Sequence, residues 1–416
     1  MKNPRRVVIT GLGVIAPNGI GKDTFWQNLV AGKSGIDYIT AFDPTPYPCH
    51  VAGEVRDFDP KAFMHVRRTK HRGRFSQFAV AAAKLALADA KLDLAIESPR
   101  RVVACLGNSM NGAGDVYETA RTGYDQDGMR GIPLMSGIEF DAHAPVSHVS
   151  AELGIRGQAM TIASACSTGL DAIQWGFDQI QKSQADVVFA GSTEAPISEF
   201  CFATLCALGA LSTFNDPPLK ASRPYDRRRE GLVLGEGAAI CVLEELEHAR
   251  DRGAHVYAEV LGHGTGNEGG FGNKMNAAEL ALTEAITSAL ASADVSPHDV
   301  DHVNAHGNSL PDYDLIETRA FRLAFGSAAY SIPTSSIKSM IGHAMGAASA
   351  LQTVASCLTL EHSIIPPTIN YEVPDPECDL DYVPNIARTS RVKTVLINAH
   401  AMGGTHSVLV LRKPEL

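Results

Sequence analysis

The sequence lacks the features that would place it in or across a membrane. It contains no apolar run of 18 or more residues, so no transmembrane helix is expected. Its opening segment, MKNPRRVVITGLGVIAP, is positively charged and then apolar, but Gly11 and Gly13 interrupt the apolar part. That pattern favours a first strand entering a turn over a signal peptide, and we expect a cytoplasmic protein.

Short-spaced cysteine pairs and an excess of positive charge are also missing. The eight cysteines show no C-x-x-C spacing, and a disulfide framework is not expected in so long a chain without an export signal. A formal net charge of −10 argues against general nucleic-acid binding. With 416 residues, 45% of them apolar and 20% charged, the composition is that of an ordinary globular protein.

Positive charge is nevertheless concentrated in two short segments. HVRRTKHRGRF (65–75) and RPYDRRR (223–229) are both rich in lysine or arginine. Such runs are either solvated, salt-bridged surface or a local docking patch for an acidic partner.

Strand-like runs rich in Val, Ile and Leu alternate with helical patterns along the whole chain, which is typical of α/β architecture. Because the runs lack strict alternation, we expect sheets covered on both faces. The pattern suggests two similar halves, residues 1–250 and 251–416, joined near ELEHARDRGAH (245–255). The predicted strands are 6–10, 101–107, 186–191, 238–245, 255–264, 302–307, 394–400 and 406–412, and the predicted helices are 76–92, 167–184, 276–293, 315–325 and 346–363.

The stretch ASACSTGLDAI (163–173) places Cys166 between a predicted strand and a predicted helix. Partial positive charge at a helix N-terminus favours the thiolate over the thiol, and small neighbours leave room for a substrate. A free cysteine is also commonly an inert core residue, so the junction alone leaves both interpretations open.

Two histidines and a lysine make a catalytic interpretation stronger. His306 and His343 each lie beside a glycine near a predicted strand end, and open α/β sheets bind ligands at the carboxyl ends of their strands. Lys338 is either a surface lysine or a partly buried cation paired with Glu317 or Asp314. Two weaker alternatives are a zinc site formed by the cysteine and both histidines, and a dinucleotide loop at GLGVIAPNG (11–19).

Five stretches follow one another along the chain: SACSTGLDAI, RPYDRRREGLVLGEGAA, NAHGNSLPDYDLIE, SIKSMIGHAMGAA and NAHAMGGTHSVLVL. In this order they resemble the β-ketoacyl-[acyl carrier protein] synthases. The resemblance runs from about residue 4 to 412, and it is closest to ketoacyl synthase II and to the ketosynthase subunit of type II polyketide synthases. It implies the thiolase fold, a five-layer αβαβα sandwich of two similar halves, usually dimeric.

The resemblance also implies a Cys-His-His site. Cys166 matches the acyl-accepting cysteine, His306 and His343 match the histidine pair, and Lys338 matches the active-site lysine, with Glu317 as its partner. The implied reaction is a decarboxylative condensation that needs no metal or redox cofactor, because the substrates are carried on the phosphopantetheine of an acyl carrier protein. Backbone N–H groups of Cys166 and Met402 are the expected oxyanion hole.

The implied partners are an acyl carrier protein and a second ketosynthase chain. The second chain would form a homodimer or a heterodimer with a chain-length-factor-like homologue, and neither nucleic acid nor a membrane is expected. Carrier proteins of this family are acidic, so salt should weaken docking on a basic patch. The candidate docking residues are Arg67, Arg68, Lys70 and Arg72.

Two loops and the acyl pocket depart from the family pattern. Relatives commonly have F-G-F-G-G-T-N where this chain has His400-Ala401-Met402-Gly403-Gly404-Thr405-His406, so a flexible methionine replaces an aromatic gate. We interpret His400 as a pocket-wall residue, with a role in protonation as the alternative. The phosphopantetheine loop reads Asn308-Ser309-Leu310 instead of T-S-T, and bulky Met110 and Leu232 occupy acyl-pocket positions.

Three functions compete on these observations. An elongating ketosynthase is favoured over a non-elongating partner subunit, because such subunits typically lack the cysteine that this chain has at Cys166. An acyltransferase or hydrolase using the same cysteine would need one base, whereas this chain offers two histidines. Fatty acid and polyketide synthesis both remain open as the pathway.

Overall fold

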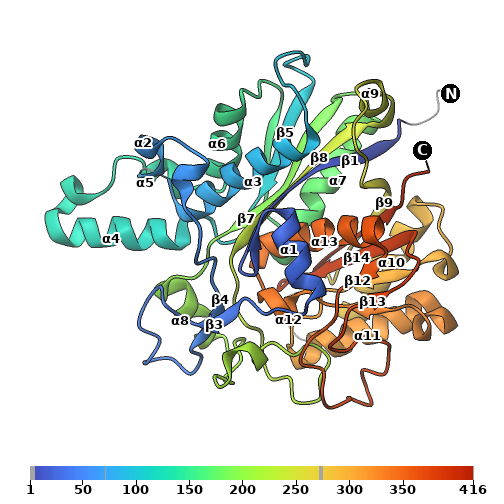
Figure 1. Cartoon of the computed structure of the whole chain (residues 1–416). Coiled ribbons are helices and arrows are strands. Elements are labelled where there is room, and N and C mark those ends of the chain that lie inside the picture. Colours follow the sequence, from blue (N-terminus) through green and yellow to red (C-terminus); the bar gives the residue numbers. More distant parts are fainter. Residues whose placement is uncertain (1–4, 71, 271–274, 416) are drawn as a thin grey trace.

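The computed structural model describes residues 5–70, 72–270 and 275–415, so His71 of the basic segment lies outside the described residues. Its main sheet has eleven strands (Figure 1): two sets of five, and the short strand β2 (Gly19–Ile20), which pairs with β1 (Val7–Ala16). The first set runs in the order β6 (Ala159–Ile162), β5 (Val102–Gly107), β7 (Val187–Glu194), β8 (Gly237–Glu245) and β1. The second runs in the order β11 (Thr334–Ser335), β10 (His302–Asn304), β14 (Thr394–His400), β15 (Thr405–Arg412) and β9 (Ala258–Asn267).

The two sets repeat one topology. Within each set the spatial order is third, second, fourth, fifth and first strand of that half. In each, the first three strands in space are parallel to one another and the last two pair antiparallel. The sets meet where Val7–Ile9 of β1 pairs with Ala258–Val260 of β9. The predicted two-half architecture is therefore present as a structural repeat.

Six long helices complete five layers of alternating helices and sheet. Helices α3 (Arg74–Ala90) and α6 (Ala144–Leu153) cover the outer face of the first set. Helices α10 (Met275–Ser292) and α11 (Pro311–Phe325) cover the outer face of the second. Between the sets lie α7 (Thr168–Gln181) and α13 (Ala348–His362), which pack on each other and on strands of both sets. This arrangement confirms the predicted fold class.

Side chains along each strand alternate between the two faces of the sheet. The two sets of strands therefore border three hydrophobic cores, one in the central layer and one outside each set. Along β15, Leu409 and Leu411 face the central layer, whereas Val408 and Val410 face the helices outside the second set. A strand with apolar residues on both faces reads as a continuous hydrophobic run, which explains the runs seen in the sequence. Helix α13 is buried on every side from Ala348 to Leu360, and it is correspondingly rich in small residues.

Strand β1 continues through the two glycines that were expected to begin a turn. Added Cβ atoms at Gly11 and Gly13 would overlap backbone atoms of α3, namely the carbonyl oxygens of Ala86 and Ala82. The glycines therefore allow the helix to approach the strand closely. This placement also removes the dinucleotide-loop alternative, because the glycines lie inside a paired strand.

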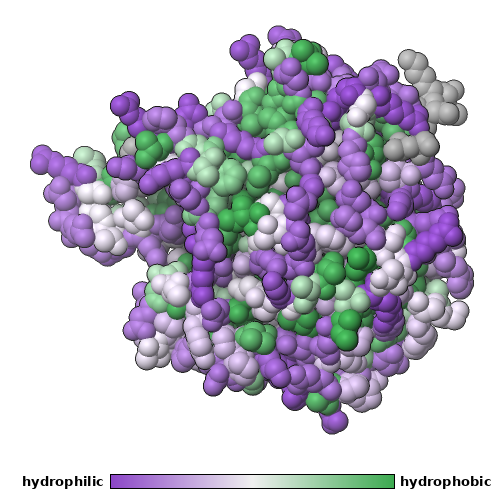
Figure 2. Space-filling view, viewed as in Figure 1, coloured by the Kyte–Doolittle hydropathy of each residue, from purple (hydrophilic) through white to green (hydrophobic). Residues whose placement is uncertain are grey.

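Further elements surround the two sets, and α4 projects from the body at the left of Figure 1. Figure 2 shows a mainly hydrophilic face with smaller hydrophobic patches. Within the described ranges, no helix has the length and hydropathy needed to cross a membrane. The further elements are α1 (Lys22–Val30), α2 (Val66–Thr69), α4 (Asp115–Asp127), α5 (Ser136–Glu139), α8 (Glu199–Ala207), α9 (Leu246–Asp251), α12 (Lys338–Ile341), β2 (Gly19–Ile20), β3 (Ile36–Tyr38), β4 (Val51–Gly53), β12 (Ile364–Ile365) and β13 (Arg388–Thr389).

Candidate active site

Cys166 lies in a tight turn between β6 and α7. A 3-10 turn spans Ala165–Ser167, and Ala165 has a φ of 51°, in the left-handed region that side chains other than glycine rarely adopt. Such a conformation costs on the order of 1–2 kcal/mol and persists where the surrounding structure imposes it. The turn places Cys166, which is 3% exposed, two residues before Thr168, the first residue of α7.

The two predicted histidines converge on this cysteine. His343 follows α12, and its Nε2 lies 3.1 Å from Sγ of Cys166. His306 follows β10, and its ring meets the His343 ring edge-on at 5.1 Å between centroids. Both histidines are fully buried. The structure therefore brings together three residues that are far apart in sequence, as the sequence predicts.

Burial dominates the electrostatics of the thiol. It raises the pKa of Cys166 to about 11, against the opposing effects of the Lys338 charge and of hydrogen bonding by the backbone N–H of Met402. The thiolate preference expected from the helix N-terminus is thus outweighed in the free protein, because desolvation penalises the anion more strongly. The thiol needs a base when it reacts, and the adjacent imidazole of His343 can act as one.

The histidines are held neutral. Burial, followed by the Lys338 charge, places the pKa of His343 well below its usual value, and the same causes act on His306. Each neutral imidazole carries one N–H and one lone pair, so each can donate and accept a single hydrogen bond. Both Nδ1 atoms are buried without a hydrogen-bond partner among the described residues.

Asn308 contacts the Nε2 atom of His306. Its Nδ2 lies 3.2 Å from Nε2 of His306, and its Oδ1 accepts a hydrogen bond from the backbone N–H of Leu310 at 3.0 Å. The second contact fixes the orientation of the amide, so an N–H of Asn308 faces Nε2. Ser309 is also buried, with φ 71° and with Oγ accepting from the N–H of Arg223. Asn308 and Ser309, the two side chains predicted to bind phosphopantetheine, therefore already form hydrogen bonds within the chain.

Lys338 is buried but does not pair directly with Glu317, contrary to the expectation. Its Nζ donates to the carbonyl oxygen of His306 at 2.7 Å and to Oε1 of Gln352 at 2.9 Å. Glu317 instead accepts hydrogen bonds from the backbone N–H groups of His306 and Gly307. The carboxylate is used to hold the histidine loop, which leaves the lysine with neutral partners.

Asp314 supports the same loop from helix α11. Its oxygens accept from the backbone N–H groups of Asn308 at 3.0 Å and Tyr225 at 2.8 Å. Burial raises its pKa to about 7, although the nearby Arg229 opposes this. Asp314 therefore positions the loop through backbone contacts and has no direct contact with Lys338.

A third histidine extends the cluster. His400, at the end of β14, lies 4.5 Å from the His306 ring and 4.6 Å from the Tyr313 ring between centroids. It also stacks on His406 at 5.7 Å. This position is compatible with the pocket-wall interpretation of His400. His406 ends the unusual loop noted in the sequence, whereas Tyr313 joins the site without having been predicted. Gly403 and Gly404, between the two histidines, adopt φ angles of 108° and 87°.

An apolar cluster adjoins the site. Leu232 lies in its buried core, and Met110 and Met402 pack against it with Leu310. Glu194, which sequence reasoning missed, is fully buried beneath this region, and its carboxylate accepts from the backbone N–H groups of Met110 and Gly346. Because Glu194 ends a strand without any motif around it, only its contacts reveal this supporting role.

The four candidate docking residues differ in exposure. Arg67, Arg68 and Lys70 lie on or directly after the short helix α2. Arg72 has only 6% of its side chain exposed, and like Arg68 it pairs with Glu152. Arg72 therefore contributes little surface to a docking patch.

Two of the four arginines in the second basic segment form ion pairs within the chain. Arg228 pairs with Glu372, and Arg229 pairs with Asp375. This pairing favours the salt-bridged interpretation of residues 223–229.

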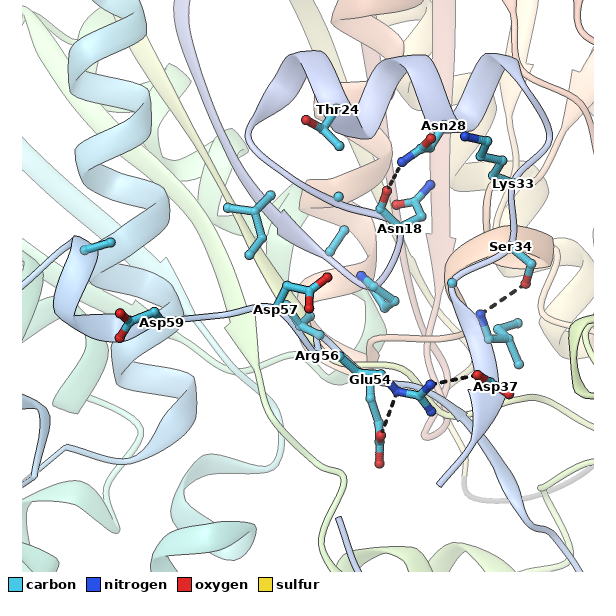
Figure 3. A pocket seen from close by; sticks show the side chains of 18 of the residues that line it. Asn18, Thr24, Asn28, Lys33, Ser34, Asp37, Glu54, Arg56, Asp57 and Asp59 are labelled. Atoms are coloured by element: carbon cyan, nitrogen blue, oxygen red, sulfur yellow. Dashed lines mark hydrogen bonds and ion pairs between the residues drawn. The ribbon is translucent and has the colours of Figure 1, made fainter. Parts of the chain in front are cut away.

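A large cavity lies away from this chemistry. It has a volume of about 780 Å³ and is bounded by α1, β3 and the segment after β4 (Figure 3). Its Arg56 is paired with Asp37 and Glu54, and no cysteine or histidine lines it. Across the described ranges, no group of three or more His, Cys, Asp or Glu residues is arranged to hold a metal.

The chain matches the models of two domains of one known family. Residues 4–249 match the N-terminal domain of β-ketoacyl synthase, and residues 257–372 match its C-terminal domain. A tetracenomycin polyketide synthase ketoacyl synthase alpha subunit from Streptomyces glaucescens is 44% identical over 99% of this chain and 98% of its own. A 3-oxoacyl-[acyl-carrier-protein] synthase 2 from Coxiella burnetii is 40% identical over 98% of this chain and 99% of its own.

Solved structures give the same result. A type II polyketide synthase ketosynthase, AntDE, in complex with its acyl-carrier protein AntF and bound to the hexaketide, superposes with a TM-score of 0.91 at 34% identity. It covers 99% of this chain and 100% of that one. The ishigamide ketosynthase/chain length factor gives the same TM-score, identity and coverage. Matched along both halves, with its cysteine and two histidines together between them, this chain belongs to the β-ketoacyl synthase family.

Proposed function

We propose that this protein is an elongating β-ketoacyl-[acyl carrier protein] synthase, an acyltransferase of the 3-oxoacyl-synthase type. It condenses a malonyl group on a carrier protein with an acyl chain held as a thioester on Cys166. The observation that carries the proposal is the 3.1 Å contact between Cys166 Sγ and His343 Nε2, with the His306 ring beside it. In this proposal residues 1–250 supply the nucleophile and residues 251–416 supply both histidines.

The first half-reaction transfers the acyl chain to the enzyme. Sγ of Cys166 attacks the carbonyl carbon of the incoming thioester while its proton moves to Nε2 of His343. In this proposal the backbone N–H groups of Cys166 and Met402, which both act to lower the pKa of the thiol, stabilise the oxyanion. The bond to the pantetheine sulfur then breaks, and the departing thiolate takes the proton from His343.

The second half-reaction forms the carbon–carbon bond. The malonyl thioester loses carbon dioxide, and the electron pair of the broken bond forms an enolate. The enolate oxygen accepts hydrogen bonds from Nε2–H groups of the neutral His306 and His343, and His343 changes tautomer after the first half-reaction so that Nε2 carries its proton. The enolate carbon attacks the acyl carbonyl on Cys166, and collapse of the adduct releases the cysteine thiolate, which takes a proton from solvent water. Because Asn308 occupies Nε2 of His306 in the free protein, the substrate carbonyl must take its place and meet the Nε2–H tautomer.

The proposed carrier partner is acidic and docks near α2. The exposed cations Arg67, Arg68 and Lys70 supply the complementary charge. Two observations support polyketide synthesis as the pathway: the alpha-subunit relative from Streptomyces glaucescens, and the similarity to ketosynthases solved with a carrier protein or a chain length factor. The substrates bring the phosphopantetheine arm with them, and a condensation without net redox change needs no redox cofactor.

A second ketosynthase-like chain is the proposed dimer partner. In the described chain β6 pairs only with β5, so its other edge is open to another strand. The nearby segment from α4 to α5 exposes large apolar side chains, a pattern that marks an interaction surface. These side chains are Tyr124, Met129, Ile132, Leu134, Ile138 and Phe140.

The decisive experiment combines purified protein, an acyl-carrier and a malonyl-carrier, with and without a co-expressed second ketosynthase chain. Intact-mass measurement should show an acyl-enzyme and then a β-ketoacyl product longer by two carbons. Transfer or hydrolysis of the acyl chain without carbon–carbon bond formation would reject elongation. A product that requires the second chain would identify a heterodimer.

A further inference from the structure

Gln352 lies at the centre of the molecule with its side-chain amide fully engaged. It is completely buried in α13. Its Nε2 donates to the carbonyl oxygens of Asn304 at 3.1 Å, Ala305 at 2.9 Å and Asn398 at 3.2 Å. Because carbonyl oxygens only accept, these contacts determine which end of the amide carries the nitrogen. Oε1 is therefore the atom that faces Nζ of Lys338, at 2.9 Å.

Lys338 is thus a buried cation with neutral partners. The lysine is 1% exposed, and its other hydrogen bond goes to the carbonyl oxygen of His306 at 2.7 Å. Among the described residues it forms no ion pair with a carboxylate. A buried charge is normally compensated by a contacting counter-ion, so this arrangement leaves the positive charge uncancelled at short range.

The groups that face this charge are those of the catalytic site. The carboxyl groups of Glu317 and Asp314, on helix α11, do not contact the lysine, but their negative charges act to raise its pKa against the larger effect of burial. After burial, the largest influence, the Lys338 charge acts to lower the pKa of the Cys166 thiol. It acts in the same direction on the imidazoles of His306, His343 and His400. The state of this one lysine therefore influences the nucleophile and all three histidines.

We infer that Gln352 is a positioning residue of this active site: it holds the ammonium group of Lys338 beside the His306 loop as a neutral acceptor, so that the charge acts on the Cys166 thiolate. This inference rests on the proposed function, in which Cys166 is the nucleophile. A carboxylate at the same position would form a contact pair with Lys338 and cancel much of its field at the sulfur.

The test is the substitution Gln352→Glu, which is nearly isosteric and places one negative charge against Nζ. Iodoacetamide alkylation of Cys166 is measured between pH 7 and pH 10 in the free protein, with Cys166→Ala as the blank for other cysteines. Burial lowers the pKa of Lys338 to about 8, so its charge acts on the sulfur mainly below that pH. At pH 7 alkylation should therefore be about tenfold slower in the variant, equivalent to a shift of the reactivity curve by about one pH unit. An unchanged curve in a variant with native circular dichroism and melting temperature would overturn the inference.

Gln174→Glu is the matched control, because it makes the same substitution at another buried glutamine, whose Nε2 contacts Val408. An equal shift in the control would also overturn the inference, because burying any new carboxylate would then be enough to slow alkylation.

If Gln352→Glu does not fold, the variant Gln352→Met provides the test instead. It removes the acceptor without adding charge and should slow alkylation at pH 8 at least about threefold, because the lysine is then a less stable cation. The alkylation experiment uses no substrate, so its result does not depend on condensation. If the unaltered protein failed to condense acyl and malonyl groups, that result would reject the proposed function without deciding the role of Gln352.

Discussion

Sγ of Cys166 lies 3.1 Å from Nε2 of His343, although 177 positions separate the two residues in the chain. The cysteine comes from the turn before α7 and the histidine from the turn after α12, so the contact joins the two halves of the fold. Because burial raises the pKa of the thiol to about 11, the protein holds a protonated thiol next to a neutral base. Reactivity then depends on proton transfer inside the site when the substrate arrives.

Removing the nucleophile should abolish condensation without unfolding the protein. Cys166→Ala deletes the sulfur that forms the acyl-enzyme, so we expect no acyl-enzyme by intact mass and a loss of at least about a thousandfold in condensation. Cys241→Ala changes a free cysteine inside strand β8, in the hydrophobic core, and should keep full activity. Condensation by the Cys166 variant would contradict the mechanism.

The two histidines should affect different half-reactions. His343→Ala removes the base in contact with Cys166, so acyl-enzyme formation should slow by about a hundredfold or more. His306→Ala, which lacks that contact, should form the acyl-enzyme at a near-normal rate but decarboxylate malonyl-carrier far more slowly. Rapid-quench mass measurement of the acyl-enzyme, combined with carbon dioxide release, separates the two steps. Equal losses in both steps for both variants would refute this division.

A buried histidine outside the catalytic cluster should make stability depend on pH. Burial lowers the pKa of His302 from 6.5 to about 3. The unfolded chain therefore binds this proton first as the pH falls, so the stability contributed by neutral His302 is present above about pH 6.5 and is lost below it. Between pH 7 and pH 5 the unaltered protein should lose about 2 kcal/mol more unfolding free energy than His302→Gln. Urea unfolding at both pH values measures the difference, and equal losses would contradict the assignment.

Charge reversal near α2 should weaken carrier-dependent turnover selectively. Changing Arg67, Arg68 and Lys70 together to glutamate should raise KM for carrier-borne substrate by about tenfold or more, and 0.5 M salt should reduce the difference. Turnover of a small pantetheine thioester should be unaffected. Lys413→Glu reverses an exposed charge near the C-terminus and serves as the control. Equal effects on both substrates would exclude a docking role.

Local patterns in the sequence identify the elements but place their ends less well. The predicted strand 394–400 coincides with β14 (Thr394–His400), because a run of apolar residues there pairs on both sides. The first strand is longer than predicted. Gly11 and Gly13, which locally read as a turn, are required by the close approach of α3, and that approach is a tertiary contact.

By itself, the sequence determined the fold class and the two-half organisation, and it singled out Cys166, His306 and His343 as candidate catalytic residues, because each rests on residue types and motifs that can be read along the chain. Only the tertiary structure decided how these residues are supported. Glu317 was expected to pair with Lys338, yet it holds the backbone of the histidine loop, while the motif-free Gln352 contacts the lysine. The tertiary structure also decided that the thiol is protonated, since desolvation depends on the layers that close over Cys166 and outweighs the helix terminus beside it.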